Sequence, residues 1–166
     1  MSLNSIDYKI LEILQKDARI TQSELAAAVG LSQPAVADRM RKLEQDGVIL
    51  QYAARIDARK LGKDITAFIG VGIDHPKHNK NFARKIMGLS EVLECHHVTG
   101  QDSYLLKVKI ENTEKLDELI SEHIRTIPGV TRTHTAIVMS SVKECSYIAT
   151  PEKNSQPVQR NPKRSK

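Results

Sequence analysis

Polar and cationic side chains gather along one side of residues 33–46, opposite an apolar stripe. Val36, Met40 and Leu43 recur at i, i+4 and i+7, a spacing that places side chains on one face of a helix. The other face is free to offer hydrogen bonds and positive charge, as a recognition helix does in the major groove of DNA. Together with the start of the preceding helix, the candidate contacts to double-stranded DNA are Thr21, Gln22, Ser32, Gln33, Pro34, Ala35, Asp38, Arg39, Arg41 and Lys42.

The residues before this helix carry the signals of a helix-turn-helix. Thr21 and Glu24 have the spacing of a capping box, which begins a helix. Gly30 suits a left-handed turn, and Ser32 is expected to cap the second helix. A further helix is predicted in front of these two, with Leu3 as hydrophobic staple, Asn4 as cap and an apolar face of Ile6, Ile10, Ile13 and Leu14.

A change of pattern follows Gly47, which is expected to end the second helix of the motif. Residues 48–56 are rich in apolar and β-prone side chains, so they predict a strand that serves as a wing or a tether. The sequence therefore predicts a helix-turn-helix domain over 1–50, a linker strand or tether over 51–64, a second domain over 65–150 and a tail over 151–166.

The basic charge of the chain is concentrated in its tail. Residues 1–56 hold 7 Lys or Arg and 7 Asp or Glu, and residues 57–150 hold 13 and 12. Residues 151–166 hold 5 and 1, and we expect this Pro-containing segment to be disordered. A neutral DNA-binding domain neutralises few phosphates, so we expect an oligomer that gains affinity by presenting several such domains.

Cysteine usage and hydropathy argue against a disulfide-rich secreted protein and against a membrane protein. Two cysteines, Cys95 and Cys145, are too few for a disulfide framework. No apolar run is long enough to predict a membrane span or a signal peptide. These features predict a soluble, cytoplasmic protein.

From residue 65 the periodicity indicates strand, helix, strand, strand, helix and strand. The strands are expected at 65–73, 92–99, 104–110 and 131–139, and the first helix at 79–89. The second helix is expected to begin at a Thr113 cap and to end at Pro128-Gly129, with a buried stripe of Leu116, Leu119, Ile120, Ile124 and Ile127. This βαββαβ order predicts a ferredoxin-like domain, and an α+β chain overall.

Such a sheet has both helices on one face. Apolar residues alternate on both faces of these strands, so the second face is expected to pack against another copy of the chain. A homodimer is the smallest assembly that this pattern predicts.

Particular motifs in both predicted domains resemble those of the Lrp/AsnC family, the leucine-responsive and asparagine regulators also called feast/famine regulators. The motifs are Leu31-Ser32, Arg39, Leu43-Glu44 and Gly47, then residues 94–100 and 104–107. The resemblance covers residues 3–148. It implies a winged helix-turn-helix and a sensor domain that dimerises through its sheet, often assembles into octamers and binds small effectors, usually amino acids, between neighbouring dimers.

The resemblance also implies where an effector binds in this chain. The hairpin part of the site corresponds to Gly100, Gln101, Asp102, Ser103 and Tyr104, and the last-strand wall to Thr133, Thr135, Ala136, Ile137, Val138 and Met139. Many family members carry acids where this chain has Gln101 and Ser103. The single acid here is Asp102, and in an extended hairpin that shift points its carboxylate to the opposite face.

Neighbouring cysteine and histidine residues raise two other kinds of chemistry. Strand alternation places Cys95 and His97 on one face and His96 on the other, so these residues, even with His134, do not predict a metal site. Sirohaem decarboxylases resemble the same family, and His96 and His97 would be their acid-base candidates here. An intact recognition helix and an aromatic content of only 4% argue against that enzyme.

The sequence thus favours a homo-oligomeric, sequence-specific transcriptional regulator that is not an enzyme and has no cofactor. Its expected effector is an amino-acid-like small molecule. The alternatives are a DNA-architectural protein without an effector and, less favoured, the decarboxylase.

Overall fold

A computed structural model describes residues 2–151 of the 166-residue chain. Within these residues the chain forms two compact units, one of residues 2–54 with 145–151 and one of residues 55–144. The tail expected over 151–166 lies, apart from its first residue, outside the described residues. None of the helices described is long and apolar enough to cross a membrane.

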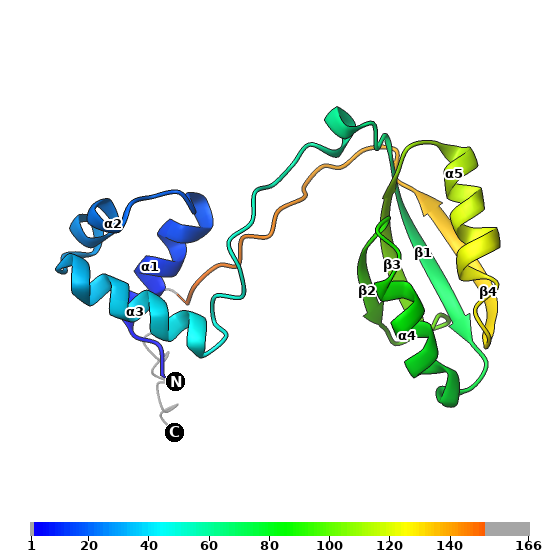
Figure 1. The fold of residues 1–166 in the computed structure, drawn as a ribbon, viewed down its shortest axis with the longest axis horizontal. Coiled ribbons are helices and arrows are strands. Elements are labelled where there is room, and N and C mark those ends of the chain that lie inside the picture. The colour runs from blue at the N-terminus through cyan, green and yellow to red at the C-terminus, as the bar shows by residue number, and fades with distance from the viewer. Residues whose placement is uncertain (1, 152–166) are drawn as a thin grey trace, which may run out of the picture. The chain divides into compact units, whose positions relative to one another are not determined.

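Three helices build the first unit (Figure 1): α1 (Ser5–Lys16), α2 (Gln22–Val29) and α3 (Gln33–Gln45). Both predicted first caps are confirmed: the Asn4 side chain accepts from the backbone of Ile6 and Asp7, and Thr21 forms a capping box with Glu24. Gly30 takes the left-handed conformation with φ 72°. The core between the helices consists of Ile10, Leu14, Leu25, Ala26, Val36 and Leu43.

The predicted side-chain cap at Ser32 is wrong. Ser32 occupies the N-cap position with an extended backbone, but its side chain accepts no hydrogen bond. An N-cap oxygen accepts from the second or third backbone N–H of the helix, and Pro34, the second residue here, removes one of these two donors. The fixed φ of Pro34 suits the first turn of α3, which forms without the serine contact.

The predicted strand over residues 48–56 is also wrong. After Gly47 the backbone N–H groups of Val48 and Ile49 both bond to the carbonyl of Leu43, and residues 51–57 follow in irregular conformation. A short 3-10 helix, η1 (Ala58–Leu61), completes the predicted linker. Apolar, β-prone side chains make a strand only where a second backbone supplies hydrogen bonds, and no described residue supplies them here.

The first unit also contains a segment from far along the sequence, residues 145–151. The Gln15 side-chain amide donates to the Ile148 carbonyl at 3.0 Å and accepts from the Ile148 N–H at 2.7 Å. The Thr150 hydroxyl donates to the Glu12 carboxylate. We call this stretch the return segment, and the first unit is therefore built from two separate pieces of chain.

The second unit has the predicted ferredoxin-like order. Its strands are β1 (Ile65–Ile73), β2 (Val92–His97), β3 (Tyr104–Ile110) and β4 (Val130–Ile137), arranged β2-β3-β1-β4 with antiparallel neighbours. Its helices are η2 (Pro76–His78), α4 (Asn79–Met87) and α5 (Thr113–Glu118), which continues as the π-helical η3 (Leu119–Ile124). The second and fourth strands each end two residues earlier than predicted.

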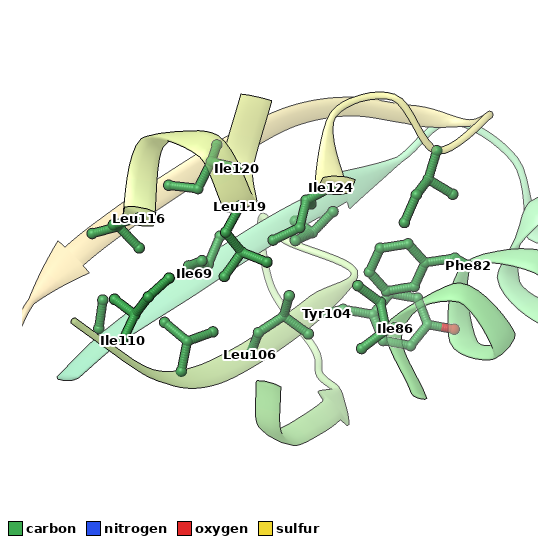
Figure 2. Close-up of a cluster of buried hydrophobic side chains, with 14 residues drawn as sticks. Ile69, Phe82, Ile86, Tyr104, Leu106, Ile110, Leu116, Leu119, Ile120 and Ile124 are labelled. Atoms are coloured by element: carbon green, nitrogen blue, oxygen red, sulfur yellow. The ribbon is translucent and has the colours of Figure 1, made fainter. Parts of the chain in front are cut away.

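Both helices lie on one face of the sheet and share one core with it. Phe82 and Ile86 of α4 point toward Tyr104 and Leu106 of β3 (Figure 2), and the Phe82 and Tyr104 ring centroids are 4.7 Å apart. The whole predicted stripe of the second helix is buried: Leu116, Leu119, Ile120, Ile124 and Ile127.

The cap of that helix is Asn112, one residue before the predicted Thr113. The Asn112 side chain accepts from the Lys115 N–H at 2.9 Å, while Thr113 is the first helical residue. Asparagine is the stronger N-cap residue of the two, so it takes the capping position.

Candidate DNA interface and sensor site

The exposed side of α3 carries most of the predicted DNA contacts. Exposed are Thr21, Gln22, Ser32, Gln33, Pro34, Asp38, Arg41 and Lys42, whereas Ala35 and Arg39 are half-buried. The helix presents its polar side outward because Val36 and Leu43 are held in the core at 0% exposure. A surface of this kind can place polar groups against the bases and phosphates of a groove.

The Arg39 side chain forms an ion pair within its own unit. Its Nη1 lies 2.7 Å from Oδ1 of Asp7, a carboxylate whose side chain is 1% exposed. The second oxygen of Asp7 accepts from the backbone N–H of Asn4 at 2.9 Å. Arg39 therefore ties α3 to the first turn of α1, a role that the sequence analysis did not predict. The predicted Asn4 cap marks the helix start where Asp7 completes a capping box, but no sequence signal indicates that Asp7 pairs with Arg39.

The other two cations of α3 differ in their surroundings. Arg41 Nη2 lies 2.6 Å from Oδ1 of Asp38 in an exposed pair, which costs little to open for another anion. Within the described part of the chain, Lys42 has no carboxylate within 4.0 Å. Lys42 and Arg41 are thus the α3 cations that can reach a phosphate.

The hairpin between β2 and β3 distributes its predicted effector residues over both faces of the sheet. Gly100 turns the chain with φ 125° and leaves Gln101 exposed. Ser103 is fixed to β1, since its N–H donates to the Val71 carbonyl at 2.9 Å and its hydroxyl accepts from Ile73 at 3.1 Å. Tyr104 is buried in the core at 8% exposure, and burial raises the pKa of its hydroxyl.

Asp102 lies on the face of the sheet away from the helices, as its shifted position predicted. A Cβ on Gly70 would overlap the Asp102 carboxylate, and a Cβ on Gly72 would lie 2.8 Å from the Arg132 side chain. Arg132 Nε is 3.4 Å from Asp102 Oδ1. Two glycines of β1 therefore form a trough that holds this half-exposed pair of opposite charges.

The residues expected to form the last-strand wall also divide between two faces. Thr133, Thr135 and Ile137 pair with the buried Val71, Ile69 and Ala67 of β1, so they lie on the helix side. Ala136 pairs with Phe68 on the opposite face. Val138 and Met139 follow the strand and line a cavity of about 340 Å³, whose polar walls include Lys63, Lys109 and Glu144. Thr133 and Tyr104 both pair with Val71, whereas Val138 lies beside Thr66 near the other end of β1.

The predicted alternation of the histidines is confirmed by the register of β2. His96 pairs with Leu105 on the face away from the helices, and its Nε2 shares a hydrogen bond of 3.3 Å with the Glu94 carboxylate. His97 pairs with Tyr104, with ring centroids 5.0 Å apart, on the helix side. These two side chains cannot act on one substrate in a single cleft of this unit.

The sheet face away from the helices holds a cluster of charges at its centre. Lys107 Nζ lies 3.1 Å from Glu94 and 2.7 Å from Glu144, which comes from the segment after β4. Hydrogen bonds from Lys107 lower the pKa of both carboxyl groups, and the bond to Glu144 raises the pKa of Lys107. Beside the cluster, Phe68 and Leu105 are 37% and 36% exposed, an apolar surface that a second copy could cover.

Acid is expected to release residues 138–144 from the sheet. The Glu144 carboxyl has a pKa below its ordinary 4.5, so its stabilising contact is present above that pH and disappears as the pH falls through the lowered value. Lys107, whose pKa is raised above 10.5, keeps its charge across this range and loses it only in strong base. NMR chemical shifts of this segment should therefore change with a midpoint below pH 4.5, and Glu144→Gln should abolish that transition. A transition that persists in the variant would assign it to another group.

Family comparisons cover both units of the chain. Residues 3–49 match a model described as a winged helix-turn-helix DNA-binding domain, and residues 66–148 match the Lrp/AsnC ligand binding domain. The proline dehydrogenase transcriptional activator of Rhizobium radiobacter is 36% identical over 144 residues, which is 86% of this chain and 92% of the relative. The leucine-responsive regulatory protein of Escherichia coli K12 is 35% identical over 148 residues, 88% and 90% of the two chains.

Solved structures agree with this assignment. A transcriptional regulator from Neisseria meningitidis, in complex with L-methionine, superposes with a TM-score of 0.84 at 28% identity over 90% of this chain and 97% of that chain. A feast or famine regulatory protein from M. tuberculosis, also with L-methionine, gives 0.83 at 32% identity over 90% and 100%.

Proposed function

This chain belongs to the Lrp/AsnC family of transcriptional regulators, and we propose that it binds specific DNA sites through α3 and responds to an amino acid bound by its second unit. The observation that carries the proposal is the capped α2-turn-α3 arrangement, whose outer side is exposed while its inner side is locked in the core. The L-methionine complexes of two relatives support an amino acid as effector.

We place the effector site between copies of the second unit. The hairpin residues and the last-strand residues are each divided between the two faces within one copy, so we infer that a second copy brings complementary groups together. The Asp102 and Arg132 pair offers one charge of each sign on a half-exposed surface. An amino acid has an ammonium and a carboxylate that such groups can bind.

Regulation follows from linkage. If the amino acid binds one assembly or one spacing of recognition helices more tightly than another, it shifts the population toward that state and changes DNA affinity. The exposed Phe68 and Leu105 surface supports a homo-oligomer, with a dimer as its unit and an octamer as the expected larger assembly. We propose no catalytic role and no cofactor, and the separation of His96 from His97 supports this.

The direct test combines DNA affinity, measured by fluorescence anisotropy on the protein's own promoter region, with light scattering in the presence of each common amino acid. We expect specific binding whose affinity or assembly changes with one amino acid. Specific binding that ignores every amino acid would support the architectural alternative, and absence of DNA binding would overturn the proposal.

Substitutions then separate the two units. Arg41→Ala with Lys42→Ala should weaken specific DNA binding at least tenfold, because a base or phosphate contact contributes about 1–3 kcal/mol, and should leave assembly intact. Gly100→Trp should remove the amino-acid response while keeping DNA binding. A surviving response would show that the effector binds elsewhere, and Lys115→Ala, an exposed cation on α5, is the control for charge removal.

A further inference from the structure

The outward side of α4 carries a stripe of cations. Lys77 precedes the helix, Lys80 and Arg84 follow at an i, i+4 spacing, and Lys85 flanks Arg84; all four are exposed. Phe82 and Ile86 occupy the opposite side of the helix, where they enter the core beside Tyr104 (Figure 2). Because these two side chains are held in the core, the helix cannot rotate about its axis, and the cations stay on its solvent side.

These cations lack acidic partners. In residues 2–151, none of the four lies within 4.0 Å of a carboxylate, and Arg84 bonds only to the neutral Asn81 at 2.8 Å. Four of the six other lysines of the same unit lie within 4.0 Å of a carboxylate, among them Lys63, 2.5 Å from Glu111, and Lys115, 2.5 Å from Glu118. The α4 stripe is therefore a group of unpaired cations in a unit where most of the other lysines are paired.

The first unit has little positive charge to spare for phosphates. Its residues, 2–54 and 145–151, hold 6 Lys or Arg and 7 Asp or Glu. Of the three cations on α3, Arg39 is bound to buried Asp7, which leaves Lys42 and Arg41, the latter in an exposed pair with Asp38, to reach phosphates. Protein affinity for DNA depends strongly on the number of phosphates neutralised, so a regulator with this first unit gains from cations located elsewhere.

We propose that the α4 stripe is a second DNA contact, which binds the phosphate backbone without regard to sequence. The proposal rests on the proposed function as a DNA-binding regulator. Lys80, Arg84 and Lys85 spread over about 7.5 Å of α4 at about 1.5 Å per residue, and Lys77 lies just before them, so the stripe fits neighbouring phosphates on one strand. The acidic residues of α5 in a second copy are an alternative partner for the stripe. They are less favoured than a row of phosphates, because one of them, Glu118, is already paired with Lys115.

The test compares two neutralised full-length proteins. Lys80→Gln with Arg84→Gln removes two unpaired cations from α4, and Lys63→Gln with Lys115→Gln removes two paired cations from the same unit. Glutamine suits helix and surface positions, so circular dichroism should confirm unchanged folds. DNA affinity is measured from 50 to 300 mM KCl on the promoter region and on a random duplex of equal length.

For the α4 variant we expect the salt dependence, the slope of log K against log [KCl], to become shallower by about 2, because each phosphate that is no longer neutralised changes it by about 0.9. Affinity should fall by the same factor for both duplexes, and the control variant should keep the unmodified slope. An unchanged slope in the α4 variant overturns the inference. A loss of assembly in light scattering with an unchanged slope also overturns it and assigns the stripe to a second copy. Absence of DNA binding by the unmodified chain would instead overturn the proposed function.

Discussion

Arg39→Ala is expected to destabilise the first unit by about 3–5 kcal/mol, because it leaves the Asp7 carboxylate buried and without its cation. A domain of this size has a total stability of roughly 5–15 kcal/mol, so the variant should be partly unfolded at moderate temperature. Urea unfolding followed by circular dichroism measures the loss. DNA binding should decline in proportion to the unfolded fraction, and not through the removal of a base contact.

The matched control is Arg41→Ala, which removes the same side chain from an exposed ion pair two residues further along the helix. Its stability should change by less than about 1 kcal/mol, as for other surface pairs, while its DNA affinity falls. Equal stabilities of the two variants would contradict the role assigned to Asp7. Adding Asp7→Asn to the Arg39 variant should restore part of the stability, because the buried charge is then gone.

Gly129→Ala is expected to destabilise the second unit by about 2–5 kcal/mol for two reasons. Gly129 has φ 95°, a conformation that costs other residues about 1–3 kcal/mol. An added Cβ would also overlap the His78 side chain, and forced overpacking costs about 1–3 kcal/mol more. His78 has little freedom to move, because its Nδ1 is 2.6 Å from the Asp74 carboxylate, and Asp74 N–H donates to the Gly129 carbonyl at 3.0 Å.

Gly62→Ala is the control, since Gly62 has φ 74° in the same unit but nothing within 4 Å of an added Cβ. It should show only the conformational cost in thermal unfolding. Combining Gly129→Ala with His78→Ala should recover the overlap part of the destabilisation. If the two glycine variants unfold at the same temperature, the overlap with His78 carries no energy.

Local patterns were sufficient to predict most elements of both units. The βαββαβ order, the Thr21 capping box, and the alternation of His96 and His97 all depend on neighbours within a few residues. Contacts between distant residues were not predictable in this way. The Asp7 and Arg39 pair joins positions 32 residues apart, and nothing near either residue indicates its partner.

The wrong prediction of a strand has the same cause. The strand expected over 48–56 requires a second backbone, which the residues themselves cannot specify. The effector site that the resemblance implies, at residues 100–104 and 133–139, stays a prediction. Strand alternation divides each stretch between two faces, so the site remains a proposal that depends on a second copy.

The return segment makes the second unit an insertion within the first. Residues 55–144 leave the first unit after Ala54 and re-enter it at Cys145, and Gln15 then binds both backbone groups of Ile148. A fragment that stops at residue 54 would lack these hydrogen bonds. A chimera that gives this DNA-binding unit the sensor of a relative should therefore replace an internal cassette with two junctions, and should keep residues 145–151 from the host chain.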